Sequence, residues 1–97
     1  MSWVNARHVD DVDDTTGIPG AYSFYSVGDR QFAGMVYACP CGCGKLGGLA
    51  FKPDPSPSWQ WDGNVDRPTL KPSVRMMNDD GSEHWHGRLT AGTWEAV

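Results

Sequence analysis

The sequence is poor in basic residues and has no long apolar run. Eight Lys and Arg stand against twelve Asp and Glu, which gives a formal net charge of −4. Binding to a phosphate backbone draws on clustered Lys and Arg, so this balance argues against a nucleic-acid-binding protein. Segments 36–38 and 49–51 are among the longest apolar stretches, far shorter than a membrane span or the core of a secretory signal. We therefore expect a cytoplasmic chain with no membrane partner.

Helix signals are nearly absent as well. Twelve Gly and seven Pro interrupt every window before apolar residues can repeat at helical spacing. Short runs of alternating apolar and polar residues, typical of strands, lie between turn signals instead. The segments that read as strands are 3–9, 22–27, 31–38, 45–52, 59–61, 69–77, 84–89 and 93–96. They predict an all-β fold: a small sandwich or barrel-like sheet of about eight short strands, in a single domain spanning residues 1–97.

A domain this small has a thin core and needs a cross-link. Only 39% of the 97 residues are hydrophobic, and small folds often recruit a metal or disulfides to compensate. The three cysteines lie within five residues, Cys39 to Cys43, where bridging them to each other is strained. A reducing compartment also favours thiolates over disulfides. Metal ligation is therefore the interpretation that fits the cysteines best.

Thiolate sulfur and imidazole nitrogen are the usual ligands of zinc, and two clusters supply them. Cys39, Cys41 and Cys43 form one cluster, with Pro40 and Gly42 between them for a tight turn, and the other is His84 and His86. Two residues apart on a strand, these histidines project to the same face, so either or both could meet the cysteines. The Cys-x-Cys-x-Cys spacing differs from the usual pair of Cys-x-x-Cys motifs, which leaves a metal-free thiol cluster or a reactive cysteine as alternatives.

The number of ligands decides what such a zinc ion does. Three cysteines and one histidine would close the site, and the ion would then supply folding energy. Three ligands alone would leave a position for water, and Glu83 next to His84 would be a candidate base. The sequence has neither the His-x-Glu and Pro-Cys-x-x-Cys pair of deaminases nor the His-Glu-x-x-His of metalloproteases. These observations favour a closed, structural site.

Four segments together carry a resemblance to a known family. They are Cys39-Pro40-Cys41-Gly42-Cys43-Gly44, Trp59-Gln60-Trp61-Asp62-Gly63-Asn64, Pro68-Thr69-Leu70-Lys71-Pro72-Ser73-Val74 and His84-Trp85-His86-Gly87. In this order they resemble a family of small phage and prophage zinc-binding domains of unknown function, often mislabelled as ammonia monooxygenase. The resemblance implies a zinc-binding β domain, found also beside bacterial ubiquitin-like conjugation genes, and it implies that His86 is a stronger ligand than His84.

With a closed metal site and no recognised catalytic group, the sequence predicts a binding protein and not an enzyme. The resemblance places it in the cytoplasm of a bacterial host, where it would contact a host protein in counter-defence or host takeover. The acidic loop after the first strand is the candidate partner-binding patch, through Asp10, Asp11, Asp13 and Asp14, and it looks too polar to enter a core. Two alternatives stay open: a zinc-dependent hydrolase, and a single-stranded nucleic-acid binder that stacks bases on Trp59, Trp61 or Trp85.

Overall fold

The chain folds entirely as strands and turns in the part that the structure describes. The computed structural model describes residues 3–13, 16–55 and 57–97, and over these ranges it has no helix. Its strands are β1 (Trp3–Asn5), β2 (Arg7–His8), β3 (Ala21–Val27), β4 (Arg30–Ala38), β5 (Leu46–Ala50), β6 (Gln60–Trp61), β7 (Leu70–Lys71), β8 (Val74–Met77), β9 (Glu83–Thr90) and β10 (Thr93–Ala96). The all-β prediction is confirmed. Two predicted strands are each split in two, at Ala6 and at Pro72-Ser73, which raises the number from about eight to ten.

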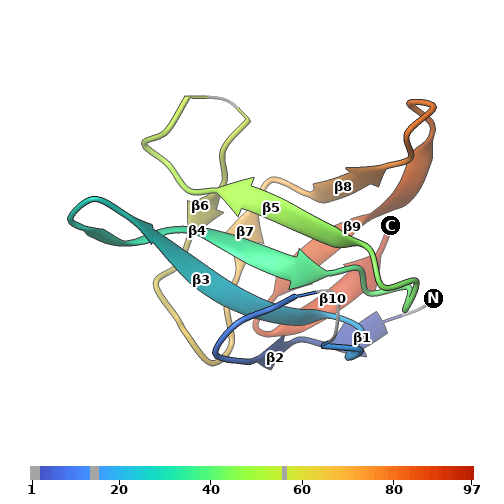
Figure 1. The fold of residues 1–97 in the computed structure, drawn as a ribbon, viewed down its shortest axis with the longest axis horizontal. Coiled ribbons are helices and arrows are strands. Elements are labelled where there is room, and N and C mark those ends of the chain that lie inside the picture. The colour runs from blue at the N-terminus through green and yellow to red at the C-terminus, as the bar shows by residue number, and fades with distance from the viewer. Residues whose placement is uncertain (1–2, 14–15, 56) are drawn as a thin grey trace.

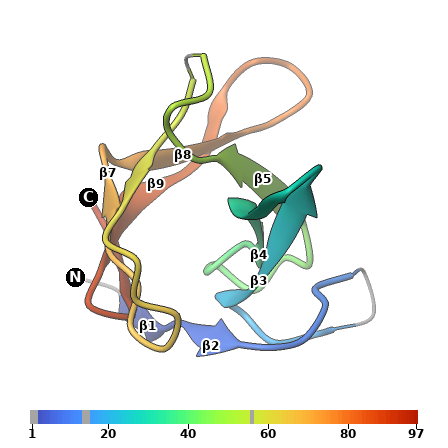
Figure 2. The same cartoon turned by 90° about the vertical axis from the view of Figure 1, so that its left-hand side faces the viewer.

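The strands form two larger sheets and one small ribbon. One sheet has the order β1-β10-β9-β8, the other β2-β3-β4-β5, and β6 pairs with β7 alone. All pairs of strands are antiparallel except β2 with β3. In Figure 1 the β3-β4-β5 sheet lies in front of β9 and β10, and Figure 2 shows the strands arranged as a ring whose interior is filled by core side chains. This is the sandwich or barrel-like arrangement that the strand pattern predicts.

Two hairpins have the turns that the sequence indicates. β3 returns into β4 through Gly28-Asp29, where Val27 faces Arg30, and Gly28 has a φ of 58° that suits glycine. β9 returns into β10 through Ala91-Gly92, where Thr90 faces Thr93. β9 is eight residues long, and it carries His84, which lies near the cysteines, and His86, which lies near Ser73.

The core lies between the two larger sheets. Its buried side chains come from strands of both sheets and from β7, and they include Tyr22, Met35, Tyr37, Leu49, Leu70, Val74, Leu89 and Trp94. Trp94 is fully buried, and its indole Nε1 donates to Gly20 O at 2.9 Å. Trp59, Trp61 and Trp85 are half-buried and pack against this core. These three indoles therefore stabilise the fold, which corrects the alternative that treats them as exposed platforms for bases.

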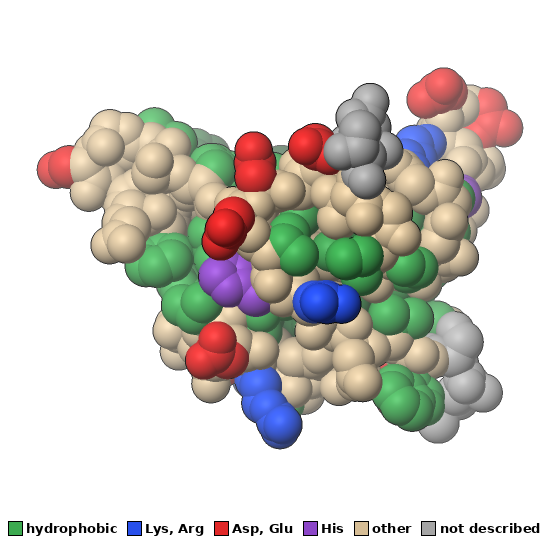
Figure 3. Space-filling model, turned by 60° about the horizontal axis from the view of Figure 1, so that its bottom comes forward, with side chains coloured by type: hydrophobic (Ala, Val, Ile, Leu, Met, Phe, Trp, Pro, Cys, Tyr) green, Lys and Arg blue, Asp and Glu red, His purple; other side chains and the backbone are tan. Residues whose placement is uncertain are grey.

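The acidic loop is exposed at its carboxylates but enters the core at one residue. Asp10, Asp11 and Asp13 are exposed, and Asp14 lies outside the described residues. Val12 is buried beside Ala21 and Ala38, and its backbone N–H donates to Ser23 Oγ at 3.1 Å, so the loop is not purely a surface segment. On the face that Figure 3 shows, several acidic side chains stand apart from one another, and Lys and Arg form no cluster. Nor do the described residues include any helix able to cross a membrane.

Candidate metal centre and active site

The cysteine turn follows β4 and is held by its own backbone. The N–H of Cys39 donates to Lys45 O at 2.8 Å, and the N–H of Gly42 donates to Cys39 O at 3.1 Å. Gly42 and Gly44 have φ angles of 88° and 84°, in the left-handed region that residues with a Cβ adopt at a cost. The glycines thus allow the chain to curl, and the curl turns the cysteine side chains toward one point.

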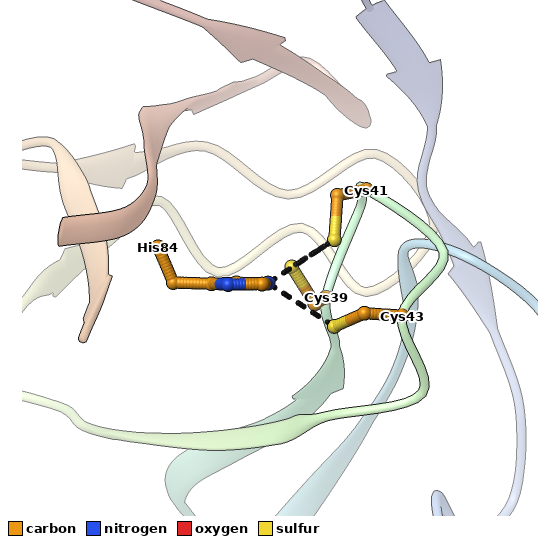
Figure 4. A group of neighbouring side chains, drawn as sticks. All are labelled: Cys39, Cys41, Cys43 and His84. Atoms are coloured by element: carbon orange, nitrogen blue, oxygen red, sulfur yellow. Dashed lines mark hydrogen bonds between the residues drawn. The ribbon is translucent and has the colours of Figure 1, made fainter. Parts of the chain in front are cut away.

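His84 of β9 completes a group of four candidate ligands. Its Nε2 lies 3.3 Å from Cys41 Sγ and 3.2 Å from Cys43 Sγ, and the sulfurs of Cys39 and Cys41 are 3.2 Å apart. Figure 4 shows the imidazole edge pointing between the sulfurs. All four ligand atoms lie within 4.8 Å of one another. In a tetrahedral zinc site, bonds of about 2.0–2.3 Å place ligand atoms roughly 3.5–3.8 Å apart, so this group is close enough to bind a metal ion.

The three thiols have different surroundings. Burial is the largest cause that raises the pKa of Cys39, to about 12. The backbone of Cys41 lowers this pKa by a hydrogen bond, and the side chain of Cys41 raises it by a hydrogen bond and by charge repulsion. For Cys41 the effect of burial is outweighed by hydrogen bonds from Cys39 and Cys43, and its pKa is lowered. The backbone N–H of Lys45 also donates to Cys43 Sγ at 3.4 Å. Three thiolates this close together would repel each other, and a bound cation would stabilise them.

His86 lies outside this cluster, which reverses the order in which the sequence ranks the two histidines. The cause is a β-bulge in the pairing of β8 with β9: Met76 faces Trp85 and Met77 faces Glu83, so His84 is an extra residue. In a regular strand, residues two apart share a face and residues three apart do not. The bulge re-aims His84 toward the cysteines and brings Glu83 to the face of His86.

His86 contacts a serine instead. Its Nε2 lies 2.8 Å from Ser73 Oγ, and its Nδ1 lies 3.7 Å from Glu83 Oε1. Ser73 is in the short connection between β7 and β8, and it is half-buried like His86. Glu83 is about half exposed, with 50% of its side chain accessible. A serine hydroxyl, an imidazole and a carboxylate thus stand in the order of a catalytic triad.

Two neighbours hold this trio in place. Arg75 is opposite His86 in the β8–β9 register, and its Nε lies 3.2 Å from the same Glu83 Oε1. The indole Nε1 of Trp59 donates to the backbone carbonyl of Ser73 at 3.2 Å. The first contact orients the carboxylate, and the second ties the loop that carries the hydroxyl to a half-buried indole.

The comparisons with known proteins bear directly on this arrangement. A family model described as "Bacterial ubiquitination-like system serine protease (BubE)" matches residues 8–97. The chain belongs to this family. No curated protein and no solved structure matches the chain. The association of BubE with a bacterial ubiquitination-like system agrees with the gene neighbourhood that the sequence resemblance implies, whereas a phage or prophage origin stays a prediction.

BubE membership corrects the functional expectation. The sequence predicts a binding protein without enzymatic activity, with a zinc hydrolase or a nucleic-acid binder as alternatives. A family described as a serine protease contradicts both the binding role and the absence of catalysis. The sequence presents both histidines as metal ligands, whereas the bulge on β9 gives them separate surroundings.

Ser73 is a candidate functional residue that the sequence alone does not indicate, and the same holds for the contacts of His86 and Glu83 with it and with each other. Serine triads on unrelated folds share geometry and not spacing, so Ser73 and His86, thirteen residues apart, form no recognisable motif. The only signal was indirect. Ser73 lies in the segment 68–74 that carries part of the family resemblance, where a serine follows a proline at a break between strands.

Proposed function

We propose that this BubE protein is a serine protease in which Ser73 is the nucleophile, His86 the general base and Glu83 the residue that orients His86. The observation that supports it most directly is the 2.8 Å contact between His86 Nε2 and Ser73 Oγ. This distance is within hydrogen-bond reach for proton transfer from a hydroxyl to an imidazole. The family description supports the same reaction class.

The chemistry follows from the positions of the three groups. Ser73 Oγ attacks the carbonyl carbon of a peptide bond while its proton passes to Nε2 of His86. The imidazolium then gives that proton to the leaving amine as the C–N bond breaks and an acyl-serine ester remains. Water, deprotonated by His86, hydrolyses the ester and restores the hydroxyl. Glu83 faces Nδ1 across 3.7 Å and stabilises the positive imidazolium, and Arg75 holds the carboxylate there.

The metal ion at the cysteine cluster is zinc in this proposal, and its role is to stabilise the fold. Three thiolates and one imidazole are the donor set of structural zinc sites, and four protein ligands leave no position for a reacting water. Such an ion would tie the turn after β4 to β9, which also carries Glu83 and His86. Binding by thiolates agrees with three cysteines that form no disulfide.

The biological setting of the reaction is taken from the family. A protease of a bacterial ubiquitination-like system would act on a protein of that system, which would be its substrate partner. Glu83 is exposed and His86 and Ser73 are half-buried, so all three side chains are accessible to a substrate segment.

A fluorophosphonate probe tests the proposed nucleophile, because it forms a covalent bond with activated serine hydroxyls. The wild-type chain is expected to gain one adduct, mapped by mass spectrometry to Ser73. Ser73→Ala is expected to gain none, and His86→Ala should react at least about 100-fold more slowly, the smallest loss that removing a general base usually causes. Ser26→Ala, which removes an exposed hydroxyl on β3, is the matched control and should react like the wild type.

Folding of each variant is checked by its thermal unfolding midpoint. An unlabelled wild type, or an adduct on another serine, would overturn the assignment of Ser73. An adduct on Ser73 that forms at the same rate without His86 would overturn the role of the base.

A further inference from the structure

The molecule has a hollow beside the proposed nucleophile, with a volume of about 460 Å³. Ser73 and Pro72 line one side of it, and Arg88 and Thr90 of β9 line the other. Pockets that hold small ligands have volumes of roughly 300–1,000 Å³, so there is room for one or two substrate side chains. Any group bound here lies next to the hydroxyl that attacks.

Charge in this hollow has one sign. Lys71 and Arg88 both line it, and none of the described residues lining it is acidic. In the described part of the chain neither cation has an ion pair or a side-chain hydrogen bond. The chain as a whole is acidic, with eight basic residues and twelve acidic ones. Two cations without an acidic partner at one hollow are therefore unusual for this composition.

The strand pattern explains why Arg88 faces the active site. Side chains alternate along β9: Gly87 and Leu89 are buried, while Arg88 and Thr90 are exposed. Arg88 therefore lies on the same face as His86, two residues further along the strand. Lys71 stands at the end of β7, two residues before Ser73. A guanidinium and an ammonium thus flank the segment that carries the nucleophile.

Glu95, Asp62 and Glu83 are on or beside neighbouring strands, and none of them lines this hollow. Glu95 faces Arg88 in the β9–β10 register, but it forms no ion pair with it and does not line the hollow. Asp62 shares a neighbouring hollow with Lys71, and its Oδ1 accepts the backbone N–H groups of Asn64 and Thr69. Glu83 is held by Arg75.

From these observations we infer that the hollow lined by Lys71 and Arg88 is a substrate subsite that binds a carboxylate next to the scissile bond. The inference rests on the proposed function of Ser73. A guanidinium and an ammonium bind carboxylates through charge-assisted hydrogen bonds. The carboxylate comes either from an Asp or Glu side chain or from the C-terminus of the substrate, and the experiment below separates these two sources.

The test measures binding and not cleavage, so it is independent of catalysis. The full chain carrying Ser73→Ala is titrated by NMR with three N-acetylated peptides: Gly-Gly-Glu-Gly-Gly amide, Gly-Gly-Gln-Gly-Gly amide, and Gly-Gly-Gln-Gly-Gly with a free C-terminus. We expect the Glu peptide or the free acid to bind roughly tenfold more tightly than the Gln amide, as one charged hydrogen bond allows. Saturable shifts should centre on Lys71, Arg88 and Thr90.

Variants locate the effect. Arg88→Gln and Lys71→Gln should each reduce the preference for the carboxylate, and Arg88→Glu should remove it. Arg7→Gln is the matched control, since Arg7 is exposed on β2 of the other sheet and does not line the hollow. Equal binding of all three peptides, shifts centred elsewhere, or a preference that survives both Gln variants would overturn the subsite. The proposed function is tested separately: absence of fluorophosphonate labelling at Ser73 in the wild-type chain would overturn it.

Discussion

His84 and His86 are two residues apart on β9, yet their imidazoles lie in different sites. Nε2 of His84 is 3.2 Å from Cys43 Sγ, whereas Nε2 of His86 is 2.8 Å from Ser73 Oγ. The bulge at His84 makes the separation possible, because it breaks the rule that residues two apart share a face. The strand β9 thereby carries a ligand of the proposed metal site and the general base of the proposed catalytic site.

The two histidines are expected to separate metal binding from reactivity. His84→Ala should lower the metal content and the thermal stability, because it removes one of four ligands. His86→Ala should keep the metal and lose most of the fluorophosphonate labelling. Metal content is measured by plasma mass spectrometry on the purified variants. Metal loss from His86→Ala with full retention in His84→Ala would contradict this assignment.

Removing the metal should unfold the chain or leave it much less stable. Three thiolates and an imidazole tie two distant segments together, and the core of a 97-residue chain is small. Incubation with a chelator, or the substitution Cys41→Ser, should lower the unfolding midpoint by at least about 10 °C, which corresponds to roughly 2 kcal/mol in a domain of this size. Calorimetry measures the shift. Cobalt substitution with an absorption spectrum typical of tetrahedral thiolate ligation provides the independent check on the ligand set.

Glu83→Gln should slow the reaction of Ser73 without unfolding the chain. The carboxylate is half exposed and stands 3.7 Å from Nδ1 of His86, so its loss removes stabilisation of the imidazolium and little packing. We expect labelling to slow by about 100-fold, less than the loss of about 10⁴-fold in kcat when the buried carboxylate of a serine triad is replaced by its amide. Glu95→Gln, on β10, is the matched control. An unchanged rate in Glu83→Gln would remove Glu83 from the triad.

Trp59 should act as a positioning residue for the nucleophile. Its Nε1 donates to Ser73 O at 3.2 Å, a bond that Trp59→Phe removes while it keeps an aromatic ring against the core. We expect a stability loss of about 1 kcal/mol together with slower labelling of Ser73. The control is Trp61→Phe, which removes a similar donor from Asn64 O at 3.1 Å. It should cost similar stability and leave the labelling rate unchanged, and equal rates in both variants would contradict the positioning role.

Alkaline pH should destabilise the fold through Tyr22. Burial raises the pKa of this phenol to about 12, and the charge of Asp66 adds to the shift. Because the ordinary value is about 10, the unfolded chain loses this proton first as the pH rises. The stabilisation is complete below about pH 10 and declines between about pH 10 and 12, by about 1.4 kcal/mol per pH unit.

Urea unfolding at pH 9 and pH 11 measures this decline. Tyr22→Phe loses the hydrogen bond to Val65 O at 2.6 Å, so it starts less stable, but its own decline should be smaller. An equal decline in both proteins would mean that Tyr22 is not responsible.

Several features of this protein follow from its sequence alone. The scarcity of helical spacing, the frequency of Gly and Pro and the alternation of apolar residues determine an all-β chain with hairpins at Gly28-Asp29 and Ala91-Gly92. The cysteine cluster indicates the metal site, because three thiols within five residues, separated by Pro40 and Gly42, form a typical set of zinc ligands.

Only the tertiary structure decided which histidine joins the cysteines, and that Ser73 meets His86 at all. Both outcomes depend on the register of β8 against β9 and on one extra residue in that pairing. A shift of one residue turns a side chain to the other face of a sheet, and no local pattern in Glu83–His86 fixes such a shift. The three cysteine ligands could be read from neighbours in the sequence, whereas the fourth ligand, His84, and the proposed triad depend on contacts that only folding makes.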